Sequence, residues 1–214
     1  MLTRAKNGDL RIISRFTRFL YYNLYFCLLF FPVLAFIIPQ NGFSIPGENA
    51  ICRIFSGISV YSQGSFDPGL SKTFFTFGFL YISILIVGVI LTWLADLATK
   101  EECLILIENL REKLKKKKIN LPFSVFFLLS GELVLILGNF GIFPKNISVG
   151  VFTGYGLSLH DMATAALSPY FEPMYHNRIG LAISGGIVIL FGYITIVFIP
   201  LLFRSLRCLV VINR

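Results

Sequence analysis

One acidic residue, Glu132, interrupts the apolar run "LLSGELVLI". An ionised carboxylate is costly inside a membrane, so such a residue commonly marks an ion or proton path that faces a cavity. The alternative is a neutral carboxyl that hydrogen-bonds to a hydroxyl of a neighbouring helix, for which Tyr81, Ser83 and Tyr193 lie at suitable depths. No second charge accompanies Glu132 at this depth, and the sequence therefore favours the neutral, hydrogen-bonded role.

Both histidines of the chain lie in one short stretch together with two acids, and these four side chains are candidate metal ligands: His160, Asp161, Glu172 and His176. Such side chains bind zinc and related metals. However, "SLHD" (residues 158–161) fits a capping box that starts a short helix, and Pro173 breaks the helical face between Glu172 and His176. We therefore expect a surface-lying amphipathic segment, with an external-face metal-dependent enzyme as an alternative.

Other motifs for catalysis or cofactor binding are missing from the sequence. No predicted span contains histidine, which excludes a haem held between two histidines of the bundle. The sequence also has no phosphate-binding glycine loop, no G-x-S-x-G and no HExxH motif. We therefore expect no cofactor and no enzymatic activity.

The elements that carry these residues are long apolar runs. Of the 214 residues, 56% are hydrophobic and only 14% are charged, against roughly 25% charged in soluble domains. Four runs are long enough to cross a bilayer as helices, and they are apolar on all sides. The sequence predicts an all-α integral membrane protein with four spans, at residues 19–39, 73–97, 121–143 and 179–203.

The distribution of Lys and Arg predicts the orientation of these spans. Fifteen basic residues lie in the N-terminal segment (1–18), the central connection (98–120) and the tail (204–214), and four lie in the other two connections. By the positive-inside rule, both termini and the central connection are cytoplasmic. The net charge of +8 then reflects membrane orientation, and we expect no nucleic-acid binding.

Three pairs of short motifs predict an internal duplication. "NGFSIP" (41–46) resembles "NFGIFP" (139–144), "FSG" (55–57) resembles "FTG" (152–154), and "LSKTF" (70–74) resembles "LSPYF" (167–171). The offsets are 98, 97 and 97 residues, so a single gap aligns all three pairs. We expect two helix–loop–helix repeats of the same orientation, 19–97 and 121–203, packed as a four-helix bundle around a pseudo-two-fold axis along the membrane normal. Chance similarity is the alternative explanation.

Two further segments predict contact surfaces. The fourth span contains small residues that allow close helix packing, either within the chain or against another subunit: Ala182, Gly185, Gly186 and Gly192. Residues 98–120 predict a cytoplasmic amphipathic helix that ends in Lys115, Lys116, Lys117 and Lys118. These lysines are expected to bind anionic lipid headgroups, while the apolar stripe of the helix could bind a partner.

These features together favour a multi-pass membrane subunit with a structural or assembly role in a larger membrane complex, the cytoplasmic (inner) membrane being its location if the source is bacterial. Its partners would be membrane lipid and other membrane subunits, or further copies of the chain. Cys52 is the one cysteine predicted on the external side, so an intramolecular external disulfide is not expected. The first alternative function is a small channel or transporter that uses Glu132.

Overall fold

The computed structural model describes residues 2–4, 10–12, 15–95, 108, 112, 121–140, 142, 150–154 and 168–212. Within these residues the fold is helical apart from one small hairpin. Strands β1 (Leu2–Arg4) and β2 (Leu10–Ile12) pair antiparallel, with Leu2 opposite Ile12. This hairpin occupies part of the predicted N-terminal segment, and no sequence pattern indicated it.

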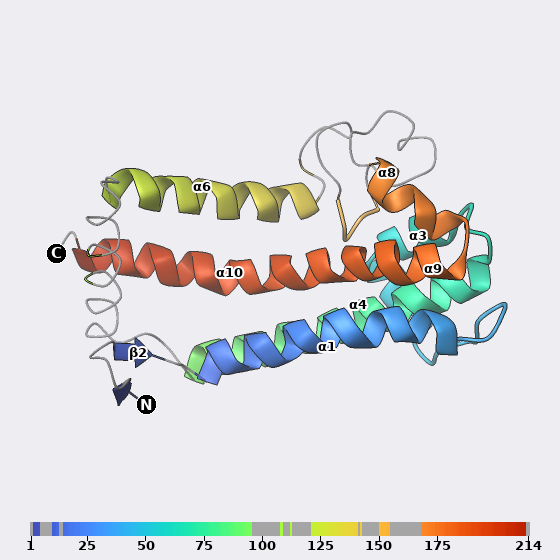
Figure 1. The fold of residues 1–214 in the computed structure, drawn as a ribbon, viewed down its shortest axis with the longest axis horizontal. Helices are drawn as coiled ribbons and strands as arrows, with labels where there is room; N and C mark the ends of the chain where they lie inside the picture. The colour runs from blue at the N-terminus through green and yellow to red at the C-terminus, as the bar shows by residue number, and fades with distance from the viewer. Residues whose placement is uncertain are drawn as a thin grey trace.

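Four long helices run side by side along the molecule (Figure 1). They are α1 (Arg15–Ile37), α4 (Pro68–Ala95), α6 (Leu121–Asn139) and α10 (Gly186–Ile212). A π-helical segment, η2 (Leu181–Gly185), and a short helix, α9 (Arg178–Gly180), precede α10 without interruption. These helices coincide with the four predicted spans to within a few residues at most ends, whereas the last helix continues to Ile212.

Two stretches are long and apolar enough to cross a membrane, Pro68–Leu91 and Arg178–Pro200. The apolar stretches Tyr21–Ile37 in α1 and Leu129–Asn139 in α6 are shorter within the described residues. Many large apolar side chains on these helices face outward, such as Leu29, Val33, Ile84, Val87 and Val134.

Short helices gather at one end of the long helices and form a cap, opposite the end where both termini lie (Figure 1). The cap consists of α2 (Glu48–Ile54), α3 (Gly57–Ser62), α8 (Ser168–Phe171) and the 3₁₀ helix η1 (Glu172–Tyr175), together with the turn at residues 150–154. The helices α2 and α3 lie in a connection for which the sequence predicted only a loop.

Helix-capping residues explain where α4 begins and where α9, which leads into α10, begins. Asp67 precedes α4, and its Oδ1 accepts a hydrogen bond from the backbone N–H of Leu70 at 2.9 Å. Asn177 plays the same part before α9, where its Oδ1 accepts from the N–H of Gly180 at 2.7 Å. Each side chain satisfies an N–H group that has no partner inside its helix.

An aromatic core lies where the cap meets the helices. Phe55 stacks on Phe79 with ring centroids 4.9 Å apart, and Tyr61 lies 4.6 Å from Phe75. The hydroxyl of Tyr61 donates to the carbonyl of Val151, so the core also joins the two connections of the cap. Phe31 of α1 extends the core by an edge contact with Phe74. These contacts fix the cap on α4, which in turn packs against α1.

Candidate functional site

Glu132 lies near the middle of α6, and its Oε2 is buried without a hydrogen-bond partner among the described residues. The expected hydroxyl partners bond elsewhere in two cases. The Tyr81 hydroxyl donates to Asn23 Oδ1 at 2.6 Å, and the Ser83 hydroxyl donates to the carbonyl of Phe79 at 2.8 Å. A buried polar atom without a partner is uncommon in folded proteins and calls for an explanation.

The helix that carries Glu132 is peripheral in the bundle. Within the described residues α6 packs extensively against α10 alone, whereas α1, α4 and α10 all contact one another. Gly131, Val134 and Leu135 of α6 are exposed and, at spacing i, i+3 and i+4, share one face of the helix. Glu132 lies beside this face, three residues before Leu135, and is partly covered.

Gly131 has no packing role within the described part of the chain, because a Cβ at this position would meet no atom within 4 Å. Glycine in the middle of a helix destabilises it by roughly 1 kcal/mol relative to alanine. The close packing of α6 on α10 therefore does not explain this glycine.

The small residues of the fourth span, by contrast, contact the rest of the chain. Ala182 is buried, and a Cβ on Gly185 would lie 2.9 Å from the ring of Phe74. A Cβ on Gly192 would lie 2.7 Å from Ile82, and one on Gly186 would make an ordinary contact with Pro32 at 3.7 Å. These residues therefore lie inside the bundle of α1, α4 and α10.

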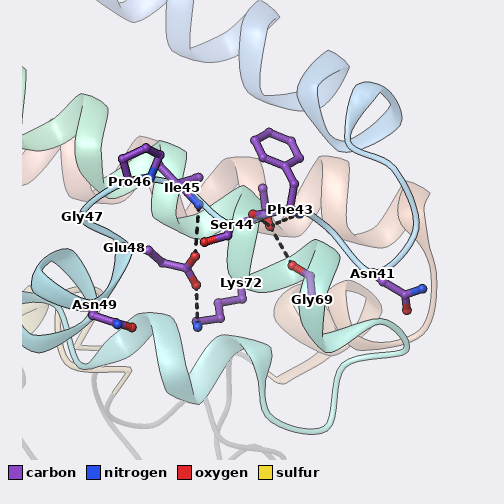
Figure 2. Close-up of a pocket in the computed structure, with 11 residues that line it drawn as sticks. Asn41, Phe43, Ser44, Ile45, Pro46, Gly47, Glu48, Asn49, Gly69 and Lys72 are labelled. Carbon is purple, nitrogen blue, oxygen red and sulfur yellow. Dashed lines mark hydrogen bonds and ion pairs between the residues drawn. The ribbon is translucent and has the colours of Figure 1, made fainter.

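A groove of about 560 Å³ lies in the cap, between residues 41–49 and the first turns of α4 (Figure 2). Glu48 and Lys72 point toward one another across it, with Oε1 and Nζ 2.5 Å apart. The other carboxylate oxygen of Glu48 accepts from the N–H of Ile45 at 3.3 Å. The hydrogen bond from Lys72 lowers the pKa of Glu48, burial opposes this shift, and the Ile45 N–H adds to it.

Polar contacts hold the walls of this groove together. Thr73 Oγ1 accepts from the N–H of Phe43 at 3.2 Å, and its own hydroxyl lies within hydrogen-bonding distance of the carbonyls of Phe43 and Gly69. Asn41, in a left-handed conformation with φ 64°, donates its N–H to Asp67 Oδ2 at 2.9 Å. Because its polar groups already bind one another, the groove acts as a clamp between the first connection and α4.

The candidate metal ligands are only partly described. Glu172 and His176 are exposed, with Oε1 and Nε2 3.6 Å apart, while His160 and Asp161 lie outside the described residues, as does the capping box at 158–161. Among the residues that the structure describes, no three His, Cys, Asp or Glu side chains are arranged to hold a metal ion.

The candidate residues predicted to be cytoplasmic fall mostly outside the described residues. Of residues 98–120, only Glu108 and Glu112 are described; both are helical and exposed. Lys115, Lys116, Lys117 and Lys118 are not among them. In the cap, Cys52 is partly buried with a free thiol.

A polar cluster inside the bundle was missed by the sequence analysis. Asn23 of α1 accepts from the Tyr81 hydroxyl, donates its amide to the carbonyl of Phe19 at 2.7 Å, and so links α1 to α4. Cys27 lies one turn further along α1 and is buried. The one asparagine in the first predicted span was the only sequence signal for this cluster.

Two of the similar motifs meet each other in the cap. The N–H of Gly57 donates to the carbonyl of Phe152 at 3.2 Å, and the rings of Phe55 and Phe152 lie 5.9 Å apart. A Cβ on Gly57 would approach the backbone N of Gly154 to 2.8 Å, so "FSG" and "FTG" are in direct backbone contact.

In each of the other two motif pairs, the two members have different structures. Asn139 ends α6, and its side-chain amide donates to the carbonyl of Leu135 at 3.0 Å. Helix α1 instead ends at Ile37, before Pro39, and Asn41 lies in the turn beyond. "LSKTF" lies within α4, whereas the described part of "LSPYF" forms the separate helix α8.

No protein-family description, curated protein or solved structure matches this chain.

Proposed function

We propose that this protein is a four-span integral membrane protein with both termini on the cytoplasmic side, and that it serves as a structural, non-enzymatic subunit of a larger membrane complex. The two long apolar helices and the outward-facing apolar side chains support membrane insertion. The position of both termini at the end opposite the cap supports an even number of spans (Figure 1). The excess of Lys and Arg in the termini and central connection supports the orientation.

One observation carries the assembly role: Glu132 is a partly covered acid whose Oε2 has no hydrogen-bond partner among the described residues, on a helix that packs extensively against only one of the described helices. Within a bilayer no water is available to satisfy such an atom. The three other long helices contact one another and enclose the small residues of the fourth span. We therefore assign the contact with another subunit to the outer side of α6.

The contact of "FSG" with "FTG" supports the proposed duplication. Equivalent residues of two related halves meet each other only near the axis that relates the halves, and Gly57 and Gly154 have this relationship. The peripheral position of α6 departs from the symmetry, because α1, its counterpart in the first repeat, packs against both α4 and α10. We propose that α6 diverged from α1 as it acquired a partner outside the chain.

The cytoplasmic side contributes a second class of contact in this proposal. Lys115, Lys116, Lys117 and Lys118 precede the point where the chain enters the bilayer at α6. Anionic headgroups there would attract each lysine by about 1 kcal/mol. The lipid contact would hold the start of α6 at the membrane surface.

The assembly role is tested by extracting the protein from its native membrane in mild detergent and identifying co-migrating chains by native mass spectrometry. We expect one or more different membrane proteins in a fixed ratio to this chain. A monomer or a homo-oligomer, found without other subunits under several detergents, would contradict the role.

A small channel or transporter is the second candidate function, and the observation that favours it is the acidic side chain of Glu132, whose Oε2 has no hydrogen-bond partner among the described residues. In that case Glu132→Gln abolishes ion or solute flux into vesicles while protein levels stay unchanged. Normal flux in this variant would rule out a path that depends on the carboxylate.

A further inference from the structure

We propose, building on the assembly role above, that the face of α6 formed by Gly131, Glu132 and Leu135 docks a transmembrane helix of another protein, and that this helix carries Lys or Arg at the depth of Glu132. The three residues lie on adjoining positions of one helix, and Gly131 and Leu135 are exposed. The proposal names the chemistry of the partner, which the assembly role alone does not.

The carboxylate calls for a cation. Ionisable residues inside a membrane pair with one another or with backbone groups, because an unpaired charge there is costly. Glu132 makes no ion pair with any residue that the structure describes, and its Oε2 has no hydrogen-bond donor among them. Glu132 as a whole is only partly covered, so a Lys or Arg side chain arriving on a partner helix can bring the opposite charge to its carboxylate.

Gly131 explains how that helix approaches. Small residues allow the backbones of membrane helices to come close together. A Cβ on Gly131 would meet nothing within 4 Å, so contacts within the described chain do not require glycine here. The destabilising effect of this glycine on α6 is understandable if another helix crosses at this point.

A second copy of the chain does not fit this face. None of the four predicted spans contains Lys or Arg, so a copy brings no cation to the depth of Glu132. A symmetric contact through α6 would instead bring two Glu132 carboxyls together. The partner is therefore a different protein.

The test measures how the purified full-length protein, in phosphatidylcholine vesicles, binds synthetic transmembrane peptides. The peptides are about 20-residue Leu/Ala helices with a single central Lys, Ser or Leu, long enough to span the bilayer. Each peptide carries a dansyl group, and the only tryptophan of the chain, Trp93, serves as the energy donor. Resistance of the protein to carbonate extraction is measured on the same vesicles.

We expect the wild type to bind the Lys peptide roughly three- to fifteenfold more tightly than the Leu peptide, the range found for polar contacts between membrane helices. Glu132→Leu and the closer mimic Glu132→Gln should both abolish this preference. Gly131→Leu should weaken binding of the Lys peptide by blocking close approach. Val87→Leu, at a position of α4 that is also exposed, is the control for added bulk and should leave binding unchanged.

Four results would overturn the proposal. Equal binding of the Lys and Leu peptides, or a preference that survives Glu132→Leu, would show that the carboxylate does not select a cation. Equal binding of the Ser and Lys peptides would assign the contact to a neutral donor. Energy transfer from Trp93 of one copy of the protein to a dansyl group on another copy, if it depends on Glu132, would assign the face to a second copy. Extraction of the protein by carbonate would contradict membrane insertion itself. An inserted protein that shows no preference among the peptides would contradict only this inference.

Discussion

At the scale of single residues, two glycines have opposite surroundings, as the neighbours of an added Cβ show. Gly57 faces three backbone atoms, of Gly154, Val151 and Phe152, at 2.8 to 3.1 Å from an added Cβ. At Gly131, an added Cβ would meet no described atom within 4 Å. The first position needs glycine to close the cap, and nothing inside the described chain needs it at the second.

Gly57→Ala should therefore destabilise the protein, because backbone atoms in a closed turn move less readily than side chains. We expect a loss of about 1 to 3 kcal/mol, as for other overpacked sites. Gly131→Ala is the matched control and should raise stability by up to about 1 kcal/mol through helix propensity. Thermal unfolding of the purified variants in detergent measures both changes. Equal unfolding temperatures for the two variants would contradict the contact between "FSG" and "FTG".

The Glu48–Lys72 pair predicts an acid-sensitive contribution to stability. The pKa of Glu48 is lowered in the folded protein, chiefly by the hydrogen bond from Lys72. Its stabilising effect is therefore complete above the unfolded pKa of about 4.3 and is lost as the pH falls through the lowered folded value. Lys72 is partly exposed, so solvent screens the pair and limits its contribution to under about 1 kcal/mol.

Glu48→Gln should lower the unfolding temperature at pH 7, and the gap to wild type should close below about pH 4. Glu172→Gln removes an acid whose Oε1 lies 3.6 Å from an exposed histidine, and it should change stability less. Unfolding curves at several pH values distinguish the two variants. A gap for Glu48→Gln that persists unchanged at low pH would mean that the ionised pair does not hold the groove closed.

At the scale of elements, the adjacent glycines where η2 passes into α10 have different neighbours because a helix turns by about 100° per residue. Gly185 faces the ring of Phe74 on α4, at 2.9 Å from an added Cβ. Gly186 faces Pro32 on α1 at an ordinary 3.7 Å. The helix therefore approaches α4 closely at one residue and leaves room beside α1 at the next.

Gly185→Ala should destabilise the packing of α10 on α4 by about 1 to 3 kcal/mol. Gly186→Ala should be neutral or stabilising, because the added Cβ makes only an ordinary contact with Pro32 and alanine favours the helix. Unfolding temperatures of the two variants in one detergent provide the comparison. A larger loss at Gly186 would contradict the arrangement of the helices.

The long helices could be predicted from sequence because an apolar run of about 20 residues leaves few alternatives. The residues at which these helices end could not be predicted in this way. Helix α1 ends before Pro39, whereas Asn139 itself ends α6, although the two motifs look alike. The contact between Gly57 and Gly154 depends on two connections about a hundred residues apart, and no local pattern indicates it. Glu132 could be singled out from its type and depth, but only the positions of the neighbouring helices show that its Oε2 has no hydrogen-bond partner among the described residues.

At the scale of the whole molecule, the described structure has two different ends. One end holds the cap, with its polar clamp and aromatic core, and the other holds both termini (Figure 1). Between them the helices expose apolar side chains such as Leu29, Ile84 and Leu91. An apolar middle between two such ends fits the proposed four-span arrangement, in which the cap lies outside and the basic segments lie inside.

The most direct test of this account is labelling of single cysteines with a membrane-impermeant maleimide, in a cysteine-free background, on intact and then permeabilised cells. Asn49→Cys lies exposed in the cap, and Glu108→Cys lies exposed in the central connection. We expect Asn49→Cys to react on intact cells and Glu108→Cys to react only after permeabilisation. Labelling of Glu108→Cys on intact cells, or of neither residue before permeabilisation, would contradict a four-span protein with an external cap and cytoplasmic termini.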